Sequence, residues 1–292
     1  MNNKMRKPAW MKVRLDINKS FQGVRSIVRE QQLHTVCEEA RCPNLHECWG
    51  RGTATFMILG DTCTRSCRFC AVKTGKPAVY DLEEPLRVAE SVREMRLGHV
   101  VITSVNRDEL PDGGSEIWAA TIRKVRDLNP DTNIEVLTPD FKGIPEQLQR
   151  VFLARPDVFA HNLETVPGLY KKVRPQARYD RSLFVLQQSK LNGLLTKTGI
   201  MVGLGETHRE LSRVMTEAVE AGVDIFTIGQ YLQPTPSHLP VKRFVSPAEF
   251  AAFKEEGLSL GIKRVEAGPL VRSSYRAEEH LRNLRNVLSK AL

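Results

Sequence analysis

The stretch TFMILGDTCTRSCRFC, residues 55–70, combines a strand with a metal-ligand pattern and decides the fold. Its first part, 55–60, is an apolar run with the length of a buried strand. Three cysteines follow, Cys63, Cys67 and Cys70, with the spacing CxxxCxxC. Thiolate is a soft ligand that suits iron–sulfur clusters, so three thiolates on one loop can hold three irons of a four-iron cube. The fourth iron would keep an open position, which is typical of a catalytic metal site.

A second group of cysteines precedes this stretch. All six cysteines of the chain lie between residues 37 and 70, and the first three, Cys37, Cys42 and Cys48, have the spacing CxxxxCxxxxxC. Disulfides are disfavoured, because a chain of 292 residues can bury a core of its own and no secretory signal is evident. We therefore expect two groups of free thiols that act as ligands.

Structural zinc is the stronger alternative to an iron–sulfur cluster. Cys67 and Cys70 alone have zinc spacing, and His46 could complete a site of three cysteines and one histidine. However, no second CxxC pair lies at the usual separation. The spacing favours iron–sulfur chemistry and leaves zinc as the alternative.

The chain from residue 55 onward alternates short apolar runs with helical patterns, which is typical of a parallel sheet built from strand–helix–strand units. We expect an α/β fold, a partial (β/α)6 TIM-type barrel with N-terminal and C-terminal extensions. The expected parts are an extension at 1–54 with the first cysteine triple, a partial barrel at 55–232 and an extension at 233–292 with the run RSSY.

Six strands and their helices can be placed from these patterns. A further helix, 246–260, is expected to begin at Ser246 as cap with Pro247 in its first turn. The expected strands are 55–60, 99–105, 133–137, 158–163, 196–202 and 224–229. The expected helices are 23–33, 84–97, 115–128, 144–154, 181–191, 207–221 and 276–292, with a short apolar segment at 264–267.

Polar residues follow the carboxyl ends of the expected strands, which form the active face of such barrels. Asn162 and Glu164 alternate along a strand and so face one side, which favours a shared ligand over a salt bridge inside the barrel. His161 faces the other side and is expected to be structural. Gly203 and Gly205 would let the backbone approach a ligand or would serve only a turn.

The net charge of +9 is concentrated at the two ends of the chain. Residues 1–30 carry eight lysines and arginines against two acidic residues, and residues 271–292 carry five against two. Basic ends favour an acidic partner, or they are solvated tails. Nucleic acid is unlikely as a partner because no nucleic-acid motif accompanies the charge. No apolar run is long enough to span a bilayer, so we expect no membrane association and a cytoplasmic protein.

The CxxxCxxC run with Phe69 before its last cysteine resembles the radical S-adenosylmethionine (SAM) enzymes. The earlier run CEEARCPNLHECWG at 37–50 and the late run GPLVRSSY at 268–275 narrow this resemblance to the lipoyl synthases. The resemblance extends from about residue 31 to residue 277 and includes TSVNRD at 103–108, HNLETV at 161–166 and GQYLQPT at 229–235.

The resemblance implies two 4Fe-4S clusters with SAM as a further cofactor. Cys63, Cys67 and Cys70 would hold the first cluster, whose open iron binds the amino and carboxylate groups of SAM. The other residues expected near SAM are Phe69 at the adenine, Asn162 and Glu164 at the ribose, and Arg174 at the carboxylate.

The second, auxiliary cluster would be held by Cys37, Cys42 and Cys48 and by a serine hydroxyl. We expect that ligand to be Ser273 rather than Ser274, a choice that the sequence alone leaves open. Composition alone would make Ser273 a helix cap instead.

The same resemblance implies the reaction. The substrate is an octanoyl chain on a lysine of a lipoyl carrier domain, and sulfur enters at carbons 6 and 8. Their hydrogens are not acidic, so a general base cannot remove them and hydrogen-atom abstraction by a 5′-deoxyadenosyl radical is required. The auxiliary cluster would supply the sulfur. Serine oxygen is a harder ligand than thiolate, which makes it a plausible release point for one iron.

The implied partners are octanoylated carrier domains, namely 2-oxoacid dehydrogenase E2 subunits and the glycine cleavage H protein. An electron donor such as ferredoxin or flavodoxin and an iron–sulfur carrier complete the set. The rival functions are a methylthiolating radical enzyme that acts on RNA and a zinc-stabilised RNA-binding module.

Overall fold

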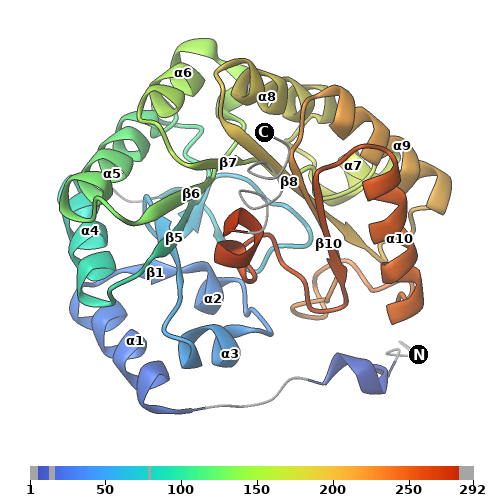
Figure 1. Ribbon diagram of the computed structural model, residues 1–292, viewed down its shortest axis with the longest axis horizontal. Helices are drawn as coiled ribbons and strands as arrows, with labels where there is room; N and C mark the ends of the chain where they lie inside the picture. Colours follow the sequence, from blue (N-terminus) through green and yellow to red (C-terminus); the bar gives the residue numbers. More distant parts are fainter. Residues whose placement is uncertain (1–5, 13–16, 78–79, 283–292) are drawn as a thin grey trace.

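The computed structural model describes residues 6–12, 17–77 and 80–282. Its centre is an eight-stranded sheet in the order β1-β2-β5-β6-β7-β8-β9-β10, which curves into an open barrel with helices on its outside (Figure 1). The expected partial TIM-type barrel is thus present. Its six predicted strands are β2 (Thr55–Ile58), β5 (His99–Ser104), β6 (Asn133–Leu137), β7 (Val158–Ala160), β8 (Leu195–Val202) and β9 (Ile225–Gln230).

These six strands are parallel to one another, as predicted. β7 is shorter than expected and ends at residue 160. After it the backbone leaves the regular ladder, and Glu164, with a positive φ of 66°, forms only an isolated bridge to Ile200.

Two further strands extend the sheet at its edges. β10 (Arg264–Gly268) pairs in parallel with β9, and β1 (His34–Thr35) pairs antiparallel with β2. The short apolar segment predicted at 264–267 is therefore a seventh parallel strand, so the sheet continues past residue 232. Because unpaired strand edges need cover, both chain extensions help to complete the barrel.

The helices that cover the barrel begin and end within about three residues of the predictions. α9 and α10 begin with capping boxes, Thr207 with Glu210 and Ser246 with Glu249, so the predicted cap at Ser246 is confirmed. The barrel helices are α4 (Glu84–Glu94), α5 (Ser115–Leu128), α6 (Pro145–Leu153), α8 (Tyr179–Leu191), α9 (His208–Glu220) and α10 (Pro247–Ser259).

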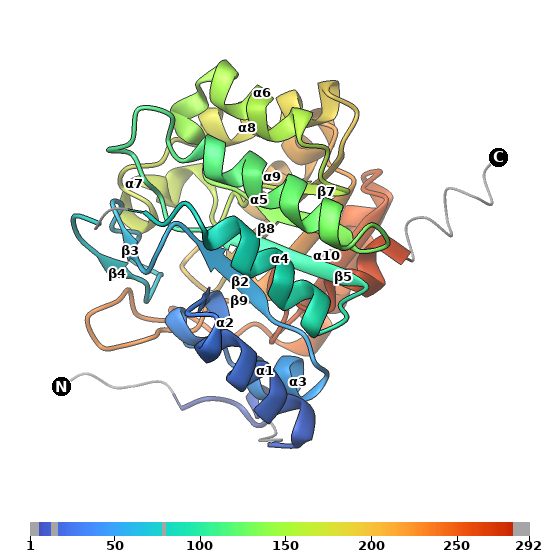
Figure 2. The same ribbon diagram turned by 90° about the vertical axis from the view of Figure 1, so that its left-hand side faces the viewer.

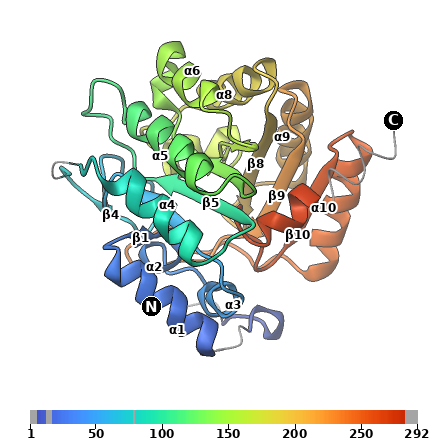
Figure 3. The same ribbon diagram turned by 60° about the vertical axis from the view of Figure 1, so that its left-hand side comes forward.

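The N-terminal extension packs beside the open part of the barrel (Figure 3). α1 begins at Lys19 rather than at residue 23, because the Asn18 side chain accepts a hydrogen bond from the Phe21 amide at 3.0 Å and caps the helix. Phe21 then stacks on His46. The extension comprises η1 (Ala9–Met11), α1 (Lys19–Glu30), α2 (Val36–Glu39) and α3 (Leu45–Gly50).

The C-terminal extension returns to the centre of the barrel. Its last described residues, 277–282, are helical, and the remainder of the helix predicted at 276–292 lies outside the described residues. This helix lies within the ring of strands in Figure 1. His280 is buried there beside the Lys197 ammonium, at 3.4 Å, and Lys197 pairs with Glu135 of β6 at 2.7 Å. The buried ion pair thus anchors the segment that carries the predicted serine ligand. No described helix is long and apolar enough to cross a membrane.

His161 joins β6, β7 and α8. Its Nδ1 lies 2.9 Å from the Thr138 carbonyl oxygen and its Nε2 lies 3.0 Å from Ser182 Oγ, so the structural role predicted for it is confirmed. Burial lowers the pKa of His161 to about 4, and the positive charge of Arg174 acts in the same direction. The ring is therefore neutral in the folded protein at neutral pH.

We expect His161 to make the fold sensitive to acid. The unfolded chain binds a proton at this residue below about pH 6.5, whereas the folded chain does so only near pH 4. Its contribution is therefore complete above pH 6.5 and is lost as the pH falls toward 4. The free energy of unfolding, measured with urea, should fall between pH 7 and pH 4.5 in both proteins. In His161→Gln this fall should be smaller than in the parent by about 2 to 3 kcal/mol.

The exposed His208→Gln variant is the control for this comparison. If His161→Gln and His208→Gln show the same pH dependence as the parent, His161 titrates like a solvated histidine and the burial argument is wrong.

Candidate metal centres

The loop with the CxxxCxxC cysteines leaves the carboxyl end of β2. It is bounded by a small parallel pair of strands, β3 (Thr62–Cys63) and β4 (Lys73–Thr74), at one end of the barrel (Figure 2). Cys63 Sγ accepts hydrogen bonds from the Arg65 amide at 3.4 Å and from the Asn106 amide at 3.3 Å. Amide donors of this kind stabilise a thiolate, as a cluster ligand requires.

The three thiols of this loop form one group. Burial raises the pKa of Cys70 to about 12, and the neighbouring Cys67 and Cys63 add to the effect. Burial also raises the pKa of Cys67, whereas the charge of Arg174 acts against it. Thiols this close together would ionise only with a nearby cation, and bound iron supplies that charge.

A buried arginine inside the loop joins it to two other loops of the barrel. The Arg65 guanidinium donates to Asp108 at 2.6 and 2.8 Å and to Asp140 at 2.6 Å. Asp108 follows β5 and Asp140 follows β6, so one side chain connects three loops. The sequence analysis missed this residue. The signal was an arginine within the metal loop combined with acidic residues after two neighbouring strands.

Three side chains expected near SAM lie together beside Cys67. Asn162 Nδ2 donates to Glu164 Oε1 at 3.0 Å, and Arg174 Nη1 donates to the Asn162 carbonyl at 2.9 Å. Three buried atoms have no partner among the described residues: Arg174 Nε, Asn162 Oδ1 and Asn106 Oδ1. Because buried polar groups are almost always hydrogen-bonded, these orphaned atoms fit a polar ligand such as SAM.

Phe69 lies at the edge of the same space. It packs against an apolar group formed by Val173, Leu204 and Tyr231. Such a position suits stacking of a flat, apolar ring. The side chain is only partly buried, so its outer face is available to a ligand.

The first cysteine triple lines a hollow between the N-terminal extension and the barrel. Burial raises the pKa of Cys37 and of Cys48 to about 12, with contributions from the neighbouring thiols, and it also raises the pKa of Cys42. The hollow is lined by all three cysteines and, from the C-terminal extension, by Arg272, Ser274 and Tyr275. Two segments more than 220 residues apart in sequence thus build one site.

Side-chain contacts hold these two segments together. Asn44 Nδ2 donates to the Leu270 carbonyl at 2.7 Å, and the Tyr275 hydroxyl donates to Glu47 at 2.9 Å. Arg51 pairs with Glu278 at 2.9 Å. The C-terminal run is therefore placed directly against the loop that carries Cys42.

Ser273 and Ser274 point to different parts of this region. Ser274 lines the hollow with the three cysteines, whereas Ser273 Oγ accepts a hydrogen bond from Asn162 Nδ2 at 3.3 Å. The sequence-based choice was Ser273. Its position is on the side of the residues expected near SAM.

Zinc receives no support from this arrangement. His46 stacks on Phe21 with ring centroids 5.2 Å apart instead of joining a cysteine site. Among the residues that the structure describes, no three His, Cys, Asp or Glu side chains are grouped to hold a single metal ion. A four-iron cube is wider than one ion, so its ligands need not converge on one point.

Known proteins match almost the whole chain. A model of the radical SAM superfamily matches residues 57–218, and a model of the N-terminal domain of lipoyl synthase matches residues 1–42. The lipoyl synthase of Rubrobacter xylanophilus is 57% identical over 96% of this chain and 88% of its own length. The lipoyl synthase of Flavobacterium johnsoniae is 53% identical over 94% and 96%. The chain belongs to the lipoyl synthase family.

Two solved structures share the fold of this lipoyl synthase family member. SuiB of Streptococcus suis, bound to S-adenosylmethionine, superposes with a TM-score of 0.59 over 78% of this chain and 55% of that chain, at 11% identity. Methylornithine synthase PylB gives a TM-score of 0.54 over 93% of both chains, at 12% identity. These likenesses confirm the fold class. Membership of the radical SAM superfamily implies a 4Fe-4S cluster and SAM.

Other polar residues after the strands have structural contacts. The amides of Gly203 and Leu204 donate to the Glu206 carboxylate at 2.6 and 2.9 Å, so this turn binds its own carboxylate. Arg107 pairs with Glu109, and Asp108 pairs with Arg65.

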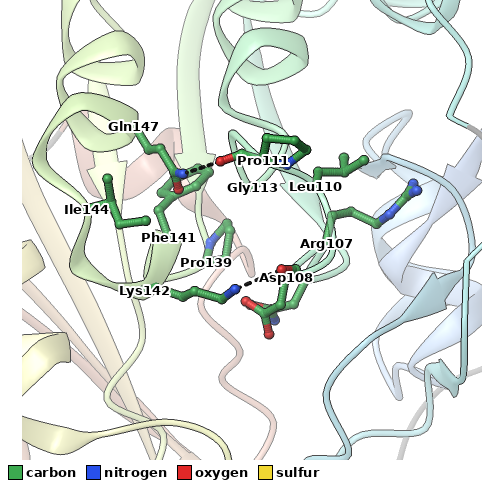
Figure 4. Close-up of a pocket in the computed structure, with 11 residues that line it drawn as sticks. Arg107, Asp108, Leu110, Pro111, Gly113, Pro139, Phe141, Lys142, Ile144 and Gln147 are labelled. Atoms are coloured by element: carbon green, nitrogen blue, oxygen red, sulfur yellow. Dashed lines mark hydrogen bonds between the residues drawn. The ribbon is translucent and has the colours of Figure 1, made fainter.

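A second hollow lies between the loops after β5 and β6 (Figure 4). Gln147 donates to the Pro111 carbonyl at 3.0 Å and Lys142 donates to the Asp108 carbonyl at 2.8 Å, so polar contacts close both ends of it. Arg107 points away from Lys142 in this view. The hollow contains no cysteine, and we assign it to the support of the Asp108 loop.

Arg65→Met should destabilise the chain, because it leaves the buried Asp140 carboxylate with only part of its compensation. We expect a loss of about 3 kcal/mol in the free energy of unfolding. The matched control is Arg178→Met, which breaks an exposed pair with Asp180 and should leave the free energy of unfolding nearly unchanged. Urea denaturation of both variants measures the difference. Equal stability of the two variants would show that the Arg65 contacts contribute nothing.

Proposed function

We propose that this chain inserts two sulfur atoms, at carbons 6 and 8, into an octanoyl chain attached to a lysine of a lipoyl carrier domain. The observation that supports this most is the presence of two thiol triples in one barrel, on either side of buried polar atoms that have no partner among the described residues. One triple suits a radical-generating cluster. The other suits a cluster that is consumed as the source of sulfur.

Cys63, Cys67 and Cys70 would hold the radical-generating cluster, and Phe69, Asn162, Glu164 and Arg174 would contact SAM. When bound, the cluster and SAM together would supply hydrogen-atom abstraction, which is the route to carbons whose hydrogens are not acidic. The protein positions the reactants and excludes water. Arg174 suits the SAM carboxylate because its Nε is buried and lacks a partner among the described residues.

Cys37, Cys42 and Cys48 would hold the auxiliary cluster as sulfur source. We assign its fourth ligand to Ser274, which lines the hollow, in place of the Ser273 that the sequence favoured. Ser273 would instead orient Asn162, to which it is hydrogen-bonded. An oxygen ligand binds iron of this kind less well than thiolate does, so it would let one iron leave as the cluster is dismantled.

The activity is tested by anaerobic incubation with SAM, a reductant and an octanoylated carrier peptide, followed by mass spectrometry. Two added sulfur atoms per peptide are expected, with about eight irons in the purified protein. A methylthiolated RNA product in place of lipoyl peptide would support the rival radical enzyme. Colourless protein that contains zinc would support the RNA-binding module.

The two serines give a second prediction with a built-in control. Ser274→Cys should keep both clusters but insert sulfur at least tenfold more slowly, because a fourth thiolate would retain the iron that must leave. Ser273→Cys should retain most of the activity. Iron content, lipoyl yield and the spectrum of the auxiliary cluster are measured in each. A slow Ser273→Cys beside an unimpaired Ser274→Cys would return the ligand to Ser273.

The partners follow from this chemistry. We propose octanoylated E2 subunits and glycine cleavage H protein as substrates, a ferredoxin or flavodoxin as electron donor, and an iron–sulfur carrier that rebuilds the auxiliary cluster, all in the cytoplasm. Arg6 and Lys7 are exposed and could meet an acidic carrier, whereas Lys4 lies outside the described residues. Neutralising Arg6 and Lys7 should raise the Michaelis constant for an intact carrier protein at low salt. An unchanged Michaelis constant would reject this contact.

A further inference from the structure

Arg272 is a partly buried arginine to which the proposed mechanism assigns no role. It lines the hollow with Cys37, Cys42 and Cys48. Its Nη1 donates to the Val271 carbonyl at 2.6 Å, and no carboxylate of the described residues forms a salt bridge with it. Its side chain is only partly exposed to water. A partly buried cation without an ion pair favours negative charge from another source in the site.

The backbone is built to bring Arg272 into this position. At Gly229 of β9, an added Cβ would lie 2.1 Å from the Val271 carbonyl oxygen and 3.3 Å from Arg272 Nη1. Only glycine therefore lets the C-terminal run pass so close to the sheet. On the other side, the Asn44 contact with the Leu270 carbonyl holds the same run against the cysteine loop.

Arg272 is flanked by negative groups of both sites. Cys42 lines the same hollow as Arg272. Glu164 accepts a hydrogen bond from Asn162 Nδ2, which also donates to Ser273, the residue that follows Arg272. Charges therefore alternate across the barrel mouth, from Cys67 through Arg174, Glu164 and Arg272 to Cys42.

We propose that Arg272 balances the negative charge of the auxiliary cluster and favours its reduced form. This inference rests on the proposed auxiliary cluster. A cube with three thiolate ligands would be anionic, and its one-electron reduction would make it more negative. A fixed cation beside the cluster lowers the free energy of that more negative state.

The test isolates the auxiliary cluster in the full chain by replacing Cys63, Cys67 and Cys70 with alanine. In this background, Arg272→Met, Arg272→Lys and Arg276→Met are compared. Arg276 is the matched control, because it lies on the same segment but is exposed and pairs with Glu47 at 3.1 Å. The midpoint potential of the cluster is measured by anaerobic titration with dithionite, followed by electron paramagnetic resonance, together with iron content and thermal unfolding.

Arg272→Met should make reduction about tenfold less favourable, a shift of 59 mV to more negative potential for one electron. Arg272→Lys and Arg276→Met should each change the reduction equilibrium less than threefold. Loss of iron from Arg272→Met alone, at an unchanged unfolding temperature, would also support the proposal, because charge would then be needed to hold the cluster.

Two outcomes would overturn the inference. One is a reduction equilibrium of the cluster in Arg272→Met that differs less than threefold from that of the background protein. The other is equal loss of iron from Arg272→Met and Arg272→Lys, which would show that the shape of the side chain matters and its charge does not. A background protein without iron would instead reject the auxiliary cluster itself, and the proposed function with it.

Discussion

The constraint on which the structure depends is the grouping of six wholly or partly buried thiols in two sets of three at the mouth of one barrel. Burial raises the pKa of Cys37, Cys48 and Cys70 to about 12, so these groups cannot supply thiolate ligands without nearby positive charge. Iron would provide most of that charge. The rest comes from arginines that the fold places beside the thiols. Metal binding and the final packing of these loops are therefore coupled.

Each thiol group is held by contacts that reach across the sequence. Arg65 connects the CxxxCxxC loop to the loops after β5 and β6 through two carboxylates. Such a network is of value chiefly for geometry, because a buried ion pair contributes little net stability but is costly to break. The result is a ligand loop whose shape is set by three strands of the barrel. A cluster bound there would sit in a preorganised site.

The other thiol group depends on both ends of the chain. The first triple lies in the N-terminal extension, and the run with Arg272 and Ser274 comes from the C-terminal extension. Exposed ion pairs such as that of Arg51 with Glu278 join the two parts and are individually weak. The buried Lys197, Glu135 and His280 provide the firmer anchor, inside the barrel. Ligands on separate segments would allow one of them to release iron while the others remain in place.

The sequence by itself determined the features that depend on neighbours along the chain. These are the parallel strands, the helices with caps such as Ser246 and the two cysteine triples, because spacing and periodicity encode local geometry. Only the tertiary structure decided which acids pair with Arg65, that β10 extends the sheet, and that Ser274 rather than Ser273 lines the hollow. Adjacent serines have the same local chemistry. Their difference arises from contacts with Asn162 and with the cysteine loop, which lie more than 100 residues away and meet them only in the folded chain.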